Sequence, residues 1–136
     1  MLELKKLDDA EVYINKTVST AELLQSIYPD RALSYTYLAL PYGNIAMFKG
    51  GREKIKYAFK VKLNAEKAMK MNPEDIYLYI ILGIYNREAA NLNWFEKLFA
   101  NSFLGDVPEG IYDESKQMLY KSLSIDHYII IAYYNL

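Results

Sequence analysis

Apolar residues recur at the helical spacing of three and four positions along most of the chain. Leu23, Leu24 and Ile27 share one face of a first helix, which Ser19 or Thr20 can cap. We therefore predict an all-α fold without a sheet. The expected helices lie near residues 20–27, 30–48, 52–71, 74–91, 94–103, 111–124 and 127–136.

The helix near 74–91 is expected to be central, because its first half is apolar on every side. Residues 1–18 are more polar and are expected to form a separate N-terminal segment or a short helix. Residues 19–136 are expected to form one helical domain, because the chain is long enough for a single sizeable core.

A sharp corner is predicted at Pro73. Asn72 can cap the following helix, and Pro73 fits its first position, where the missing N–H costs no hydrogen bond. Tyr79 follows Pro73 by six residues and Gly83 follows it by ten. These offsets are typical of tetratricopeptide-like repeats, in which a small residue lets the two helices of a pair approach.

The same offsets occur at two further corners. Pro29 is followed by Tyr35 and, ten residues on, by the small residue Ala39. His127 stands where the third proline would be, and Tyr133 follows it by six residues. The corners are further apart than the ~34 residues of a standard repeat, so each repeat must carry an insertion. The sequence predicts an irregular, right-handed α-solenoid of antiparallel helix pairs.

The third corner is followed by the mostly apolar residues 128–136. A terminal repeat normally ends in a helix with a polar outer face. We therefore expect the array to be truncated at Leu136. The apolar surface of 128–136 should be covered by helices further along the protein, by self-association or by a ligand.

One predicted helix has a lopsided charge, although the chain as a whole has 16 basic and 17 acidic residues. Five basic side chains fall in one stripe of the helix 52–71. This basic strip consists of Arg52, Lys56, Lys60, Lys67 and Lys70. It is either a solvated outer face or a docking strip for an acidic partner or anionic lipid head groups. The balanced total charge gives no reason to expect a nucleic-acid partner.

Residues 92–110 form a long insertion between two helices, where the repeat pattern needs only a short turn. Its aromatic residues recur at helical spacing. This aromatic insertion contains Trp94, Phe95, Phe99 and Phe103. Two interpretations stay open: the rings pack onto neighbouring helices, or they form an exposed site for a partner or a membrane surface.

Stacked helix pairs leave a concave groove lined by the first helix of each pair. The candidate groove residues are Tyr77, Ile80, Ile84 and Arg87. We expect no catalytic site, cofactor or metal, because the chain has no cysteine and its one histidine lies in a corner. Two functions stay open: a non-catalytic scaffold or adaptor that binds a protein or peptide in the groove, and a lipid- or membrane-surface-binding module that uses the basic strip and the aromatic insertion.

Nothing in the sequence identifies a compartment. The longest apolar run, Ile76–Tyr85, is about half of the ~20 residues that a membrane span needs. The N-terminal residues lack the apolar core of a signal peptide. We expect a soluble chain, with the cytoplasm as the default location.

Several stretches resemble the tetratricopeptide-like domain of the regulator of microtubule dynamics protein family. They are Gly51–Lys62, Lys67–Asp75, Ile81–Gly83, Leu92–Ala100 and Lys121–Asp126. The resemblance covers roughly residues 30–136, with Ser122 and His127 replacing the usual alanine and proline. It implies a helical interaction domain, and eukaryotic members of the family are linked to microtubules or to membrane contact between organelles.

Overall fold

The computed structural model describes residues 2–92, 96–97, 102 and 111–136, and among these it contains helices and no strand. The all-α prediction is confirmed. The helices are α1 (Leu2–Ile27), α2 (Ala32–Phe48), α3 (Gly51–Met71), α4 (Ile76–Ala90), α6 (Ile111–Ile125) and α7 (Ile130–Asn135). The helix expected at 94–103 lies almost entirely outside the described residues.

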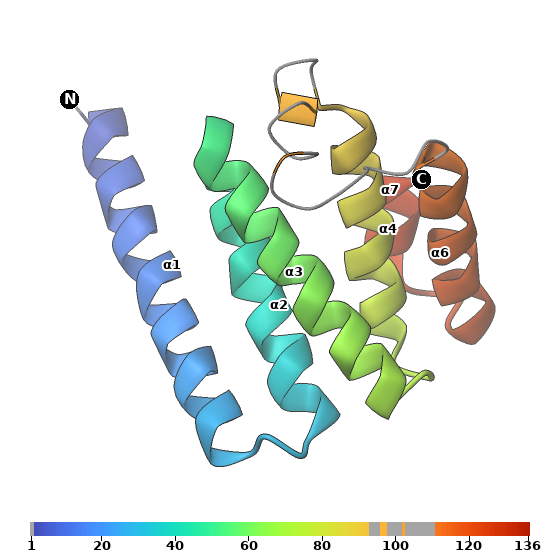
Figure 1. Cartoon of the computed structure of the whole chain (residues 1–136). Coiled ribbons are helices and arrows are strands. Elements are labelled where there is room, and N and C mark those ends of the chain that lie inside the picture. The colour runs from blue at the N-terminus through green and yellow to red at the C-terminus, as the bar shows by residue number, and fades with distance from the viewer. Residues whose placement is uncertain (1, 93–95, 98–101, 103–110) are drawn as a thin grey trace.

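The helices form a row from α1 at one end to α6 and α7 at the other, with the two termini at opposite ends (Figure 1). Each helix contacts the next described helix along the chain. The helices that follow the corners also meet one another, since α4 contacts both α2 and α7. Consecutive helix pairs therefore stack side by side.

The first helix begins much earlier than predicted. The expected helix start near residue 20 is wrong, because α1 is continuous from Leu2. The hydroxyls of Thr17, Ser19 and Thr20 each donate a hydrogen bond to the carbonyl oxygen four residues earlier instead of capping a new helix. Glu11, in the first half of α1, also forms an ion pair with Lys49 after the end of α2.

The corner before α4 is longer than predicted, and the prediction of Pro73 as the first helical residue is wrong. The helix begins at Ile76 with Asp75 as its N-cap, and Asp75 Oδ1 accepts a hydrogen bond of 3.0 Å from the backbone N–H of Tyr77. Asn72 Oδ1 accepts from the N–H of Glu74 at 3.3 Å. The two side chains thus stabilise a turn that precedes the helix.

The corners at Pro29 and Pro73 share a hydrogen bond made by the tyrosine six residues later. Tyr35 Oη donates a hydrogen bond of 2.8 Å to the carbonyl oxygen of Pro29. Tyr79 Oη donates an equivalent bond of 2.7 Å to the carbonyl oxygen of Pro73. In both cases the tyrosine hydroxyl holds the helix that follows the corner against the turn that precedes it.

The helices that precede the corners at Pro73 and His127 bury residues at the same positions. Val61, Ala65 and Ala68 of α3 are buried in the core with Tyr35, Leu38 and Ala39 of α2. Ser115, Leu119 and Ser122 occupy the equivalent positions of α6 and are also buried. Four of the six residues are Ala or Ser, whose small side chains allow close contact between helices.

Candidate groove between the helix pairs

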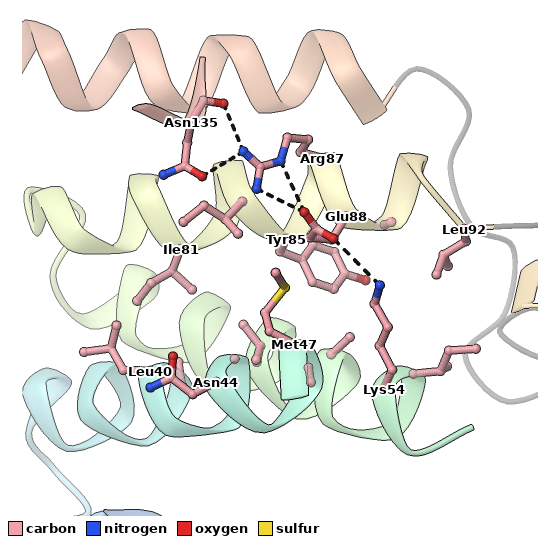
Figure 2. Close-up of a pocket in the computed structure, with 18 of the residues that line it drawn as sticks. Leu40, Asn44, Met47, Lys54, Ile81, Tyr85, Arg87, Glu88, Leu92 and Asn135 are labelled. Atoms are coloured by element: carbon pink, nitrogen blue, oxygen red, sulfur yellow. Dashed lines mark hydrogen bonds and ion pairs between the residues drawn. The ribbon is translucent and has the colours of Figure 1, made fainter. Parts of the chain in front are cut away.

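A half-open cavity of about 600 Å³ lies between α2, α3, α4 and α7. Its walls are mainly apolar, and each helix that follows a corner contributes to them. The main apolar contributors are Leu40 and Met47 of α2, Ile81 and Ile84 of α4, and Ile131 and Tyr134 of α7. Figure 2 shows side chains from these helices facing the same space. The cavity therefore lies among the three helices that follow the corners.

The four predicted groove residues do not all lie at this cavity. Ile84 and Arg87 line it. Tyr77 is 56% exposed near the start of α4 and does not line it. Ile80 is 4% exposed and belongs to the protein interior. The neighbouring residue Ile81, which the sequence reasoning did not select, lines the cavity instead.

A polar network crosses one side of the cavity and joins three helices. Arg87 Nη1 of α4 donates a hydrogen bond of 2.7 Å to Asn135 Oδ1 of α7. Arg87 Nη2 also lies 3.0 Å from Glu88 Oε1, and Lys54 Nζ of α3 lies 3.7 Å from Glu88 Oε2. Figure 2 shows Glu88 between the two basic groups. The network holds α7 against α4 at the cavity.

This network carries one more positive than negative charge, since Glu88 is shared by Arg87 and Lys54. All three side chains are partly buried, at 23 to 30% exposure, so solvent screens them less than surface charges. Burial, and to a smaller extent Glu66, raises the pKa of the nearby Tyr85 hydroxyl. Tyr85 therefore stays neutral and adds no negative charge to the cavity wall.

Asn135 was not selected from the sequence, although it completes the polar network. It is 8% exposed and its Nδ2 donates a hydrogen bond of 2.8 Å to the carbonyl oxygen of Ile131. The available signal was chemical: Asn135 is the one amide side chain in the apolar segment 128–136. A buried amide needs hydrogen-bond partners, and that requirement pointed to a polar neighbour on another helix.

The basic strip lies on exposed positions of α3, on the side of the helix away from the cavity-lining residues. Two of its lysines cover tyrosine rings. Lys60 Nζ lies 4.9 Å from the ring centre of Tyr42, and Lys67 Nζ lies 4.3 Å from that of Tyr35. Lys56 pairs with Glu53 at 3.5 Å. The strip and the cavity are thus separate features.

The aromatic insertion cannot be compared with its prediction. Trp94, Phe95, Phe99 and Phe103 all lie outside the described residues. Among the residues that are described, no group of three or more His, Cys, Asp or Glu could hold a metal ion. In the same part of the chain, no helix combines the length and hydropathy needed to cross a membrane.

The structure is that of an all-α protein, and stacked helix pairs with small residues at the crossings are features that helical-repeat proteins share. The family model described as regulator of microtubule dynamics protein 1-3 matches residues 1–135. The chain belongs to this family.

Individual relatives are more distant and considerably longer. The chain is 27% identical over 108 residues to regulator of microtubule dynamics protein 2 of Bos taurus, covering 79% of this chain and 26% of the relative. It is 28% identical over 102 residues to the human protein of that name, covering 75% and 24%. For regulator of microtubule dynamics protein 1 of Mus musculus the identity is 20% over 119 residues, covering 88% and 39%. The chain therefore spans less than half the length of these relatives.

Proposed function

We propose that this chain is a non-catalytic interaction module that binds a segment of a partner protein in the cavity between α2, α3, α4 and α7. The observation that carries this proposal is the apolar wall of the cavity, which stays exposed at its rim. Leu40, Met47, Ile131 and Tyr134 line the cavity and are 41, 59, 49 and 86% exposed. Contiguous exposed apolar surface in a concave site favours ligand binding.

The charges at the cavity specify the chemistry of the partner segment. Arg87 and Lys54 share one carboxylate, so an additional carboxylate from the partner would balance the network. Charge-assisted hydrogen bonds to Arg and Lys are stronger than those between neutral groups. The partner segment therefore presents apolar side chains to the groove and an acidic group to Arg87.

The name shared by the relatives indicates the cellular process. It describes regulators of microtubule dynamics, and it names no enzymatic reaction. We place the partner segment among proteins of the microtubule system, because the same family model covers nearly the whole of this chain. In this proposal the chain is the interaction part of a regulator.

A substitution at the rim of the cavity tests this proposal. Met47→Asp introduces a negative charge into the apolar wall at a 59% exposed position, so the fold should be unaffected. Met71→Asp is the matched control, because Met71 is 41% exposed and does not line the cavity. Peptides are selected on the wild-type chain from a random display library, and their affinities are measured by fluorescence anisotropy.

We expect the selected peptides to be apolar with an acidic residue, and to bind Met47→Asp at least about tenfold more weakly, which corresponds to ~1.4 kcal/mol. The control should bind as the wild type does. Co-sedimentation with microtubules and their associated proteins then compares the same three chains. Equal binding by wild type and Met47→Asp in both assays would exclude the cavity as the site.

A further inference from the structure

We propose that the outer face of α3 binds an acidic segment of a partner protein, in which carboxylates lie on both sides of an apolar side chain. Four exposed lysines of the basic strip supply the positive charge: Lys56, Lys60, Lys67 and Lys70. This lysine row extends about 21 Å along the helix. None of the four lysines lines the groove cavity, so the contact is separate from that of the partner segment proposed for the cavity.

The excess of positive charge is concentrated on α3. This helix contains seven basic and two acidic residues. By contrast, α1 contains three basic and four acidic residues, and α6 contains two of each. In the row of helices, α1 lies on one side of α3 and α6 lies on the other (Figure 1). A positive surface as narrow as one helix matches a linear acidic segment better than the flat face of an anionic membrane, which would also approach the acidic residues of the neighbouring helices.

The two acidic residues of α3 leave most of this charge uncompensated. Glu53 pairs with Lys56 of the lysine row at 3.5 Å. The other pair, Glu66 with Lys62 at 3.9 Å, lies outside the row. Among the described residues, the remaining three lysines of the row form no ion pair with a carboxylate. Carboxylates of a partner can therefore bind them without displacing an existing ion pair.

Two lysines of the row are held in place by aromatic rings. Lys60 Nζ lies 4.9 Å from the ring centre of Tyr42 and 5.2 Å from that of Tyr57. Lys67 Nζ lies 4.3 Å from the ring centre of Tyr35. These contacts restrict both side chains but do not neutralise their charge. Binding of a carboxylate therefore costs less side-chain entropy than it would at freely moving lysines.

The centre of the lysine row is apolar. Leu63 lies three residues after Lys60 and four before Lys67, which places it on the same face of the helix. Its side chain is 50% exposed. Phe59 precedes it by about one turn and is half-buried. The complementary segment therefore covers Leu63 with an apolar side chain and places acidic residues on either side, which distinguishes it from a uniform polyanion.

Fluorescence anisotropy with a labelled synthetic peptide tests the charge contacts. The peptide has about 14 residues, the length of the row for a helix, with glutamates on both sides of two central leucines. We expect it to bind the wild type, and to bind more weakly as the salt concentration rises. Lys56→Gln/Lys70→Gln leaves the ring contacts of Lys60 and Lys67 intact and should raise the dissociation constant at least about tenfold.

The matched control is Lys116→Gln/Lys121→Gln, which removes the same charge from exposed positions of α6. It should bind the peptide as the wild type does. Leu63→Ala tests the apolar centre: it should weaken binding of the leucine peptide, but not of a peptide with serines in place of the leucines. Circular dichroism confirms that all variants remain helical.

Four outcomes overturn the proposal. They are a wild type that does not bind the leucine peptide at low salt, an α6 control that loses as much affinity as the variant of the row, and an equal effect of Leu63→Ala on both peptides. The fourth is tighter binding of the wild type to vesicles of phosphatidylserine and phosphatidylcholine in equal parts than to the peptide, which would assign the lysine row to a membrane surface.

Discussion

Ser115 Oγ donates a hydrogen bond of 2.7 Å to the carbonyl oxygen of Gly83, where α4 crosses α6. A Cβ atom at Gly83 would lie 2.8 Å from Leu119 Cγ and 3.4 Å from the carbonyl oxygen of Ser115. Leu119 is 1% exposed, so it has little space into which to move. Glycine at this crossing therefore sets the distance between α4 and α6.

The first prediction follows from this contact. Gly83→Leu should overpack the crossing and lower the free energy of unfolding by ~1–3 kcal/mol, measured by urea denaturation. Gly83→Ala should lower it less. In a Leu119→Ala background the cost of Gly83→Ala should shrink, because the neighbouring side chain is shorter. An unchanged cost in that background would show that the two residues do not limit each other.

The second prediction concerns the hydrogen bonds of the corners. Tyr35→Phe removes the bond to the Pro29 carbonyl at a buried position and should cost ~1 kcal/mol of unfolding free energy. Tyr79→Phe removes the equivalent but more exposed bond and should cost less. Tyr133→Phe, at 56% exposure, is the control and should have the smallest effect. The same loss for all three would mean that the corner bonds contribute nothing specific.

The third prediction concerns alkaline pH. Burial, followed by the hydrogen bond from Tyr42 Oη to Glu22 Oε1, raises the pKa of Tyr42 well above its ordinary value. The unfolded chain therefore releases this proton first, at its usual pKa of about 10. The stabilisation by Tyr42 is complete below that pH and decreases as the pH rises above it.

Urea denaturation between pH 9 and pH 11 measures this effect. Tyr42→Phe should be less stable than the wild type at the lower pH, and its stability should fall less steeply as the pH rises. Tyr134→Phe, on an 86% exposed ring, should keep the wild-type slope. If the free energy of unfolding fell equally steeply with pH in the wild type and in Tyr42→Phe, the Tyr42 hydroxyl would not be the cause of the pH dependence.

The helix order and the crossings could be predicted because they depend on local patterns. The offset from Pro73 to Gly83 identifies a small residue by its distance from a corner, and the structure places it against Leu119. The predicted first residues of the helices were less accurate. Asp75 competes with Asn72 as a cap, and only the folded geometry decides that the Asp75 carboxylate accepts from Tyr77.

The candidate groove depended more on tertiary contacts. Helical periodicity could not distinguish Ile80 from Ile81, since adjacent residues of an apolar helix differ only by which neighbour covers them. Ile80 and Ile81 are both buried, but only Ile81 lines the cavity. Likewise, the hydrogen bond from Arg87 to Asn135 joins residues far apart in the sequence. No rule of local spacing could have indicated it.

The last prediction separates two roles of the basic strip. Lys67 and Lys60 cover tyrosine rings, and such contacts contribute ~0.5–1 kcal/mol at exposed sites. Lys67→Gln and Lys60→Gln should therefore lower the free energy of unfolding by about that amount, measured by urea denaturation.

Lys56→Gln is the control. It removes only an exposed ion pair with Glu53, whose contribution to stability is small.

If packing on tyrosine explains the strip, the stability loss is confined to the Lys60 and Lys67 variants. In a flotation assay, anionic vesicles then bind all variants as weakly as the wild type. If the strip instead docks on an anionic surface, Lys56→Gln must weaken vesicle binding as much as the other two, because Coulomb attraction to a charged surface depends on each exposed charge alike. Salt-sensitive vesicle binding that all three substitutions reduce equally would therefore assign the strip to a membrane surface.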